Sequence, residues 1–237
     1  MNKYTINKES SPTKWSEIFR GRNTSDIKSI SPEYNGPVEN LYIDGELSFI
    51  NRRSPRVAVV GTRDVSSYGI DCVGWIVDTL ATRQDRPIIV SGLAIGVDVK
   101  AHVAALNAGL TTVAVVPTGL DEVYPRQHTE LARRIVENEG CLITDFPEQT
   151  APIAINFLHR NHLMVKMVDM VIVVESKLKG GSMVIAKLAK DYGIPVLAVP
   201  GRIGDVRSAG CNQLIAQHIA EPLVDFEKLK SIDIPMP

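Results

Sequence analysis

Short apolar runs alternate with amphipathic segments along the chain from Arg56 onward. The apolar runs are rich in Val, Ile and Leu and contain almost no polar residues, which is typical of parallel strands covered on both faces. We therefore expect strands at 57–60, 88–90, 112–116, 142–144, 171–174 and 196–199. The segments between them have helical apolar spacing, and we expect helices near 69–82, 97–108, 129–138, 157–167, 181–191 and 212–219.

This alternation predicts an α/β fold with a doubly wound, mostly parallel sheet and helices on both faces. Residues 222–229 are expected to add a short strand and a helical turn. Residues 41–50 are expected to form a hairpin around an Asp44-Gly45 turn. Residues 1–40 are polar and predict a partly ordered extension, in which one short helical turn includes Ile18 and Phe19. The predicted division is an extension at 1–40, a single domain at 41–231 and a tail at 232–237.

The composition agrees with one domain that has a substantial core, because the 237 residues are 44% hydrophobic. The formal net charge of -1 predicts no general attraction to polyanions, so any anion site must be local. The three cysteines form no metal-binding pattern and indicate a reducing compartment. The chain start lacks the apolar core of a signal peptide, and no apolar run approaches the roughly 20 residues that span a bilayer. We expect a cytoplasmic protein without membrane partners.

Glycines, hydroxyl groups and cations follow the expected strands at their carboxyl ends, where open parallel sheets bind ligands. Glycine lets backbone amides approach a ligand closely, helix N-termini attract anions, and hydroxyls and cations complete a phosphate site. One turn alone is equally well explained as a tight connection without a ligand, but their coincidence at one edge favours an anion site. The candidate residues in these turns are Arg63, Ser66, Ser91, Gly92, Gly96, Asp98, Lys179, Gly180, Gly181, Ser182 and Gly201.

The charge distribution also favours a local anion site. Residues 151–215 contain eight Lys and Arg against four Asp and Glu. Lys187 and Lys190 are explained as ordinary solvated helix charges. The remaining loop cations at the predicted ligand edge are Lys177, Lys179, Arg202 and Arg207.

A second group of candidates lies at the start of the helix expected near 157–167. Phe157 could stack on a base or belong to the core, and the sequence favours neither. Arg160 is better explained as a phosphate contact than as a structural residue. Asn161 could read a base edge or cap the helix.

The sequence contains no convincing reaction centre. The five histidines form no metal pattern, and the G-x-S-x-G motif of serine hydrolases is absent. Asp98 can stabilise the helix start, and Glu175 is the best isolated acid, but one carboxylate is weak support for acid-base chemistry. We expect no catalytic residues, no metal and no cofactor.

The motifs VAVVGTRDVSSYG, IVSGLAIGVD, TVAVVPTGLDEVYPRQHTELARRI, FLHRN, VIVVES, VLAVPGRIGD and GCNQLI occur in one order. Together they resemble the DNA-processing protein A (DprA/Smf) family, from about Leu41 to the low 220s. The resemblance implies an extended Rossmann fold, binding of single-stranded DNA, homodimerisation and loading of the RecA recombinase during natural transformation. It implies pocket roles for Arg63, Ser91, Gly92, Asp98, Phe157, Arg160 and Asn161, and weaker ones for Lys179, Gly180, Gly181, Ser182, Gly201 and Asn212.

The sequence departs from the family pattern at two positions. The family usually has Arg where Ile95 stands and a second basic residue where His162 stands, so we expect weaker or more salt-sensitive binding. Two other functions are considered. In a nucleoside-monophosphate phosphoribohydrolase, Lys187 would stand where that signature needs an acid, and a small-nucleotide sensor could use the same phosphate site. We expect Arg63→Ala and Arg160→Ala to weaken single-strand binding and to leave folding intact.

Overall fold

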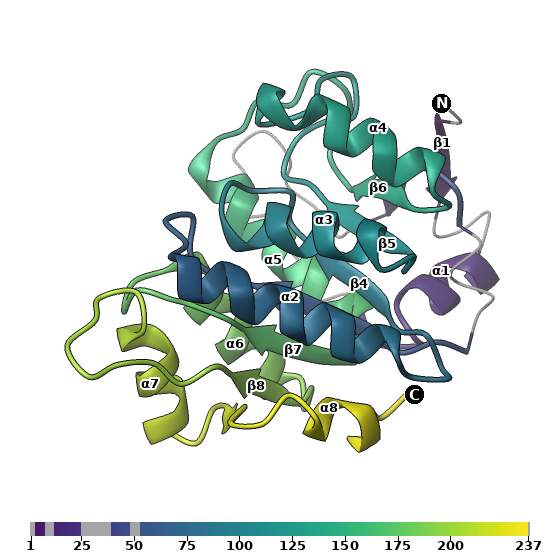
Figure 1. The fold of residues 1–237 in the computed structure, drawn as a ribbon. Coiled ribbons are helices and arrows are strands. Elements are labelled where there is room, and N and C mark those ends of the chain that lie inside the picture. The colour runs from purple at the N-terminus through teal and green to yellow at the C-terminus, as the bar shows by residue number, and fades with distance from the viewer. Residues whose placement is uncertain (1–2, 8–11, 25–38, 48–52, 237) are drawn as a thin grey trace.

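The computed structural model describes residues 3–7, 12–24, 39–47 and 53–236. Within these ranges the chain forms one nine-stranded sheet with the strand order β1-β2-β6-β5-β4-β3-β7-β8-β9 (Figure 1). The strands are β1 Lys3–Asn7, β2 Asn40–Gly45, β3 Arg56–Val60, β4 Ile88–Ser91, β5 Thr112–Val115, β6 Cys141–Thr144, β7 Met170–Val173, β8 Val196–Ala198 and β9 Glu221–Pro222. The β1–β2 and β2–β6 pairs are antiparallel, and the pairs from β6 to β9 are parallel.

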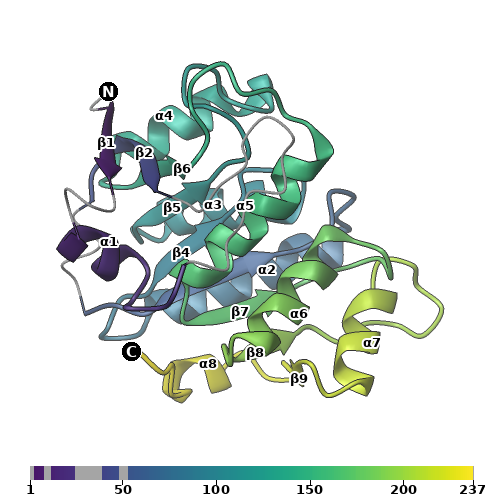
Figure 2. The same cartoon turned by 180° about the vertical axis from the view of Figure 1, so that it is seen from behind.

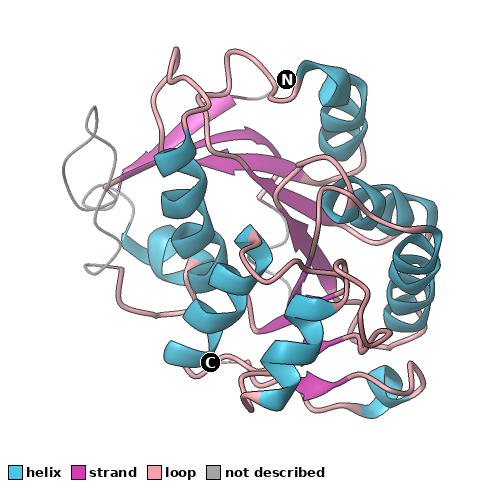
Figure 3. Cartoon of the chain, turned by 90° about the vertical axis from the view of Figure 1, so that its left-hand side faces the viewer, coloured by secondary structure: helices cyan, strands magenta, loops and turns pink. Residues whose placement is uncertain are grey.

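Two helical layers cover the sheet, as an edge-on view shows (Figure 3). Their helices are α1 Pro12–Ile18, α2 Ser67–Ala81, α3 Val97–Asn107, α4 Thr129–Glu137, α5 Ala154–Met167, α6 Gly181–Asp191, α7 Ala209–Ala216 and α8 Lys228–Ser231. Side chains of α2, α3, α4 and α8 pack on one face, while α1, α5, α6 and α7 cover the other face (Figure 2). None of these helices has the length and apolar character that crossing a bilayer requires.

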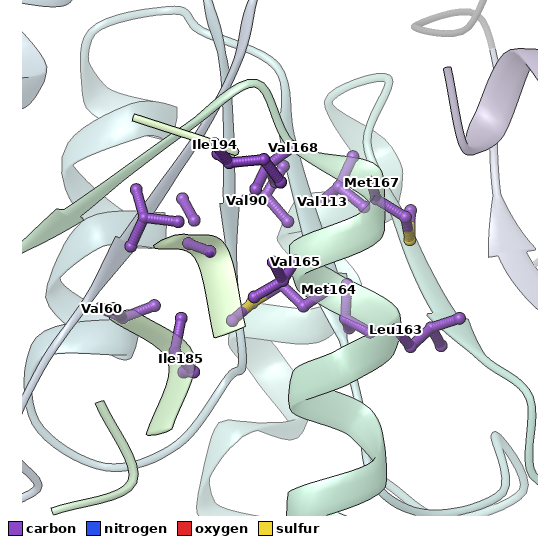
Figure 4. Close-up of a cluster of buried hydrophobic side chains, with 14 of the residues drawn as sticks. Val60, Val90, Val113, Leu163, Met164, Val165, Met167, Val168, Ile185 and Ile194 are labelled. Carbon is purple, nitrogen blue, oxygen red and sulfur yellow. The ribbon is translucent and has the colours of Figure 1, made fainter. Parts of the chain in front are cut away.

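Alternate residues of each central strand feed the two cores, which is why the strands are apolar throughout. In β3, Val57 and Val59 face the α2–α3 side, while Ala58 and Val60 face the α5–α6 side. Figure 4 shows the core on the α5–α6 side, to which Met164 and Val165 of α5, Val60 of β3 and Ile185 of α6 all belong. The predicted α/β class and the doubly wound, mostly parallel sheet are confirmed.

The hairpin turn expected at Asp44-Gly45 is not formed. Asp44 and Gly45 lie within β2, where they pair with Leu142 and Cys141 of β6. Gly45 is required there because its φ is 117° and a Cβ would lie 2.4 Å from the Gly140 carbonyl oxygen. Most of the expected second arm, residues 48–50, lies outside the described residues. The Asp-Gly pair therefore serves a close strand contact and not a two-residue turn.

The described part of residues 1–40 is packed against the domain. Ile18 and Phe19, at the end of α1, are fully buried. The buried Arg56 guanidinium donates to the Glu17 carbonyl at 3.0 Å and also to the Ile18 carbonyl. Arg56 is fully buried and burial lowers its pKa to about 9, so these carbonyl oxygens compensate for its desolvation. The boundary at residue 41 stays a prediction.

The strand order reverses direction between β3 and β7. From β3 the chain continues outward to β4, β5 and β6, and it then returns through α5 to β7 on the other side of β3. The loops after β3 and β7 therefore diverge, and their helices lie on opposite faces of the sheet. This switch point is where open α/β sheets leave a crevice for a ligand.

Candidate functional site

A cleft of about 230 Å³ lies at this switch point. Its walls come from the loops after β3 and β7, the start of α3, and the first half of α5. The lining residues are Val60, Gly61, Thr62, Arg63, Ala94, Asp98, Phe157, Arg160, Asn161, Lys177, Gly180, Gly181, Ser182 and Ile185. The cleft thus combines three cations with one acid.

Arg63 and Phe157 form one wall of the cleft. The Arg63 guanidinium carbon lies 5.1 Å from the centroid of the Phe157 ring. Tyr124 meets the same ring edge to face, with centroids 6.0 Å apart. Phe157 is only half-buried and belongs to none of the core clusters of the described residues. Its ring is therefore available to a ligand on the cleft side, which favours stacking over the core explanation.

Arg160 is deeply inserted beside this wall. Its side chain is 5% exposed, and Nη1 donates to the Val115 carbonyl oxygen at 2.7 Å. Burial lowers the pKa of Arg160, while the charge of Asp98 opposes that shift and the charge of Arg63 adds to it. The Arg160 charge at the base of the cleft is thus fixed in position by the Val115 carbonyl and balanced by Asp98.

Asp98 lies in the first turn of α3 and faces the same cleft. Burial raises its pKa, and the Arg160 charge opposes this shift. The amide of Ala94 donates to Asp98 Oδ2 at 3.4 Å. These contacts make Asp98 a counter-ion for Arg160 and a stabiliser of the helix start, because a carboxylate by itself repels an anion.

The N-terminus of α6 forms the opposite wall. Gly180 precedes the helix and provides no side-chain cap, so the first amides of α6 are not satisfied by a capping side chain. A Cβ at Gly181 would meet nothing within 4 Å, which shows that the space beside it is open. Ser182 lines the cleft, but its hydroxyl donates to Ser176 at 2.8 Å. A helix start of this kind attracts phosphate oxygens.

Lys177 is a lining residue that the sequence placed only among the loop cations. Its ammonium group lies 3.4 Å from Asp64, and Arg207 contacts the same carboxylate at 3.2 Å. The neighbouring candidate Lys179 is exposed and does not line the cleft. Which of two lysines in one loop points inward depends on the turn geometry, and the sequence does not reveal it.

Ser66 and Ser91 do not reach the cleft, contrary to the sequence-based expectation. Ser66 caps α2 by accepting from the Gly69 amide at 3.1 Å, and its hydroxyl donates to Glu175 at 2.6 Å. Glu175, the best isolated acid of the sequence, is 1% exposed and used in this cap. Ser91 is fully buried and donates to the Val59 carbonyl at 2.7 Å. Each hydroxyl is satisfied within the domain.

Gly96, Gly201 and Asn212 also have structural roles outside the cleft. Gly96 has a φ of 91°, and a Cβ there would lie 2.2 Å from the Thr62 carbonyl oxygen. Asn212 accepts from the Gly201 amide at 3.1 Å and donates to the Gly201 carbonyl at 3.0 Å. These contacts fix the loops around the cleft.

An apolar cleft adjoins the first one and shares Arg63, Ala94 and Phe157 with it. Its other lining residues are Gly92, Ile95, Pro117, Tyr124 and Pro125. Ile95, one of the two departures from the family pattern, thus contributes apolar surface beside the aromatic rings. His162, the other departure, does not line either cleft and lies 3.3 Å from the Tyr192 hydroxyl.

None of the described histidines lines the cleft. His102 is fully buried, contacts Thr112 at 2.7 Å, and has its pKa lowered to about 3 by burial and by Arg160. His159 pairs with Asp145, and both are fully buried. Within the described residues, no three His, Cys, Asp or Glu side chains are grouped to hold a metal ion. Asp98 is the acid that lines the cleft.

Several known proteins are similar to this chain. Residues 23–232 match the family model described as DNA recombination-mediator protein A. The chain is 39% identical to protein Smf of Escherichia coli over 193 residues, which are 80% of this chain and 50% of that protein. It is 36% identical to DNA processing protein DprA of Streptococcus pneumoniae over 188 residues, which are 79% of this chain and 64% of that protein. The chain spans about half the length of the first relative and less than two thirds of the second.

Two solved structures are similar over most of the chain. DprA of Streptococcus pneumoniae superposes with a TM-score of 0.75 at 33% identity and covers 83% of this chain and 68% of that one. DNA processing protein A of Helicobacter pylori superposes with a TM-score of 0.76 at 26% identity, with coverage of 96% and 94%. That structure is described as giving insight into a single-stranded DNA binding mode. A molybdenum cofactor binding protein from Rippkaea orientalis, at 16% identity and a TM-score of 0.51, shares the fold alone.

Proposed function

Because the chain belongs to the DNA recombination-mediator protein A family, we propose that it binds single-stranded DNA in the cleft at the β3–β7 switch point. In this proposal the cleft holds the sugar-phosphate backbone and leaves it intact. The bound strand is protected and presented for recombination. The convergence of Arg63 and Arg160 on the uncapped start of α6 is the observation that supports it most directly.

Charge and geometry support binding of a phosphate in this cleft. Arg63 is exposed and can move toward a phosphate, whereas Arg160 is fixed by the Val115 carbonyl. The α6 amides add hydrogen-bond donors that need no side-chain rearrangement. Charge-assisted contacts of this kind are the stronger class of hydrogen bonds. The arrangement recognises phosphate groups, which every nucleotide carries.

The adjoining apolar cleft supports binding of a nucleic acid over a free phosphate. Aromatic and aliphatic surface in this cleft comes from Phe157, Tyr124 and Ile95. Arg63 lines the same cleft, and the Phe157 ring contacts both its guanidinium and the Tyr124 ring. A base that leaves the phosphate cleft can lie against this surface. Stacking of bases on aromatic side chains is a common feature of single-strand binding proteins and tolerates any sequence. Duplex DNA keeps its bases stacked inside and gains less from the same surface.

The partners in this proposal are single-stranded DNA, the RecA recombinase and a second copy of the chain. The family description as a recombination mediator supports the RecA partnership. A homodimer would place two clefts on one strand and raise the apparent affinity through effective concentration. We propose that the protein acts in the cytoplasm, where internalised strands and RecA meet.

We propose that the protein is not an enzyme. Of the two other functions considered, phosphoribohydrolase activity needs an acid, but Lys187 occupies that position and is exposed on α6. Asp98 is held as the counter-ion of Arg160. A sensor for a small nucleotide would use the phosphate cleft but not the adjoining apolar one, so it predicts tight mononucleotide binding.

Titration of labelled oligo-dT and of a duplex of equal length tests the proposal. We expect preference for the single strand and a loss of at least about tenfold in Arg63→Ala, because one charge-assisted contact contributes about 1.5–3 kcal/mol. Arg133→Ala is the matched control, since Arg133 is an exposed α4 cation paired with Glu130 and Glu137. Equal affinity of both variants, release of free base from a nucleoside monophosphate, or tight mononucleotide binding without oligo-dT binding would each refute it.

A further inference from the structure

A second polar cleft of about 460 Å³ continues the same edge of the sheet beyond the apolar one. It lies over the carboxyl end of β5, and Tyr124 lines both clefts. The other lining residues are Thr118, Gly119, Asp121, Glu122, Val123, Arg126, Gln149, Thr150, Ala151 and Pro152. A strand that leaves the phosphate cleft past Phe157 and Tyr124 therefore meets this surface next.

The charge of this cleft is opposite to that of the first. Asp121 and Glu122 are exposed on its wall, and the one cation, Arg126, is paired with Glu122. The phosphate cleft contains Arg63, Arg160 and Lys177. Neighbouring clefts of opposite charge orient a ligand that has one anionic part and one part rich in hydrogen-bond donors.

Thr118 gives a second and independent reason to expect a ligand. It lines this cleft and is only 4% exposed, and its hydroxyl oxygen makes no hydrogen bond to a described residue. A buried hydroxyl without a partner is costly, so such groups usually have a partner when the protein works. Asp44 lies at the adjoining small cavity, is 5% exposed, and has one carboxylate oxygen in the same condition.

We propose that this cleft, defined by Thr118, Asp121 and Glu122, binds the amino edge of a nucleobase. The inference rests on the proposed binding of single-stranded DNA and adds a base preference to it. The phosphate is held between Arg63 and Arg160, since the carboxylates repel it from the second cleft. The base passes Tyr124 and points its exocyclic amino group toward these acceptors.

This arrangement favours cytosine over thymine. Cytosine presents an N4 amino donor, which carboxylates accept in known protein–DNA contacts. Thymine presents carbonyl oxygens on both sides of its one ring N–H, and these oxygens are repelled by the carboxylates. The two pyrimidine rings stack alike, but thymine has an additional C5-methyl group, so the apolar cleft alone favours thymine and a preference for cytosine has to come from the acceptors of the second cleft. We expect oligo-dC to bind at least about fivefold more tightly than oligo-dT of equal length, which corresponds to one modest base contact.

Two isosteric substitutions and a matched control test the base contact. Asp121→Asn keeps an oxygen to accept from the Gln149 amide, which Asp121 now does at 2.9 Å, and it removes only the charge. Glu122→Gln removes the charge of the neighbouring residue and also weakens its pairing with Arg126. Both variants should bind oligo-dC less tightly and oligo-dT more tightly, so the ratio falls toward one. Glu137→Gln, which removes an equally exposed carboxylate on α4, should leave the ratio unchanged.

Thr118→Val adds a variant that changes no charge. Removal of an unpartnered buried hydroxyl should leave the protein at least as stable, while the oligo-dC preference decreases. The opposite responses of the two ligands separate a base contact from general damage to the fold.

Equal binding of oligo-dC and oligo-dT by the unmodified protein would overturn the inference and leave the proposed function standing. An unchanged ratio in Asp121→Asn and Glu122→Gln would also overturn it, and would indicate that the acids face a cationic protein partner. Failure to bind either oligonucleotide would refute the proposed function itself.

Discussion

Arg160 occupies the space that a side chain at position 92 would need. A Cβ built on Gly92 would lie 1.7 Å from Nη1 of Arg160, which is the nitrogen that donates to the Val115 carbonyl. The φ angle of Gly92 is not in the left-handed region. A glycine is needed at this position because a larger residue has no room there, and not because of the backbone conformation. Gly92, in the SGLA turn, therefore leaves the space that the Arg160 guanidinium needs to reach the Val115 carbonyl.

We predict that Gly92→Ala weakens both folding and DNA binding. The added methyl group must displace the Arg160 guanidinium, with loss of its carbonyl contact, and should cost about 1–3 kcal/mol of unfolding free energy. Urea denaturation and oligo-dT titration measure the two effects. Gly74→Ala is the control, because a Cβ at this α2 position meets nothing within 4 Å. That variant should gain about 0.5–1 kcal/mol of stability and keep its affinity. Equal stability of the two variants would refute the account of Gly92.

Ser66→Ala should separate the scaffold from the binding surface. The variant loses the cap of α2 and one donor to Glu175, and caps of this type contribute about 0.5–2 kcal/mol. We expect a lower midpoint in urea and an unchanged affinity for oligo-dT at low temperature, where the variant stays folded. A large loss of affinity with unchanged stability would instead make Ser66 a ligand contact.

His102 should make folding weaker in mild acid. In the folded protein the pKa of His102 is lowered to about 3, mainly by burial and to a smaller extent by the Arg160 charge. In the unfolded chain the same imidazole has its ordinary pKa of about 6.5. The unfolded state therefore binds more protons below that pH, so the unfolding free energy decreases as pH falls from about 6.5 toward 3.

The His102 contribution should approach about 1.4 kcal/mol per pH unit within that window. His102→Asn removes the titrating group and keeps a side chain that can contact Thr112. Urea denaturation at several pH values should then give a shallower pH dependence in the variant than in the unmodified protein. Parallel curves would show that His102 does not titrate differently in the two states.

Asp64 restrains two cations beside the phosphate cleft. It contacts Lys177 at 3.4 Å and Arg207 at 3.2 Å, and these contacts hold the pKa of its carboxyl below the usual range. Asp64→Asn removes a negative charge next to the phosphate and releases Lys177 toward it. We expect oligo-dT affinity to rise about twofold to tenfold at low salt, with a smaller gain at high salt. Asp205→Asn removes a carboxylate from the loop between β8 and α7 and serves as the comparison. A larger gain of oligo-dT affinity in Asp205→Asn than in Asp64→Asn would contradict the role of Asp64.

Regular alternation of apolar runs and helical segments was sufficient to predict most of the fold. The apolar run 57–60 is predicted to be a strand covered on both faces, and the observed β3 spans Arg56–Val60, one residue more. The turn at Asp44-Gly45 was wrong because the same two residues satisfy a β-hairpin rule and a close approach to β6. A long-range contact decides between these alternatives, and a local pattern does not contain it.

The candidate site was predicted less completely than the fold. Arg63 is distant in the chain from Phe157 and Arg160 of α5, and the three residues line one cleft, as the shared sheet edge predicts. Ser66 and Ser91 have the residue type of phosphate ligands but use their hydroxyls inside the domain. Hydroxyls serve caps and ligands equally well, and only the direction of the side chain separates the two roles.

The structure also revises the expectation that Arg160→Ala would leave folding intact. Truncation of this residue would remove the favourable charge beside the buried carboxyl of Asp98 and leave the Val115 carbonyl without its donor. Loss of binding in that variant would therefore mix two causes. Arg63 is exposed and its guanidinium lies over the Phe157 ring, so its removal tests the phosphate contact with little change to the buried part of the domain.

The salt dependence of oligo-dT binding by Arg63→Ala tests the central claim most directly. If Arg63 neutralises a phosphate, the plot of log affinity against log salt should become shallower by about 0.7 relative to the unmodified protein, since one fewer counterion is released. The Arg133→Ala control should keep the original slope. An unchanged slope and affinity in Arg63→Ala would contradict the claim that the switch-point cleft holds the DNA backbone.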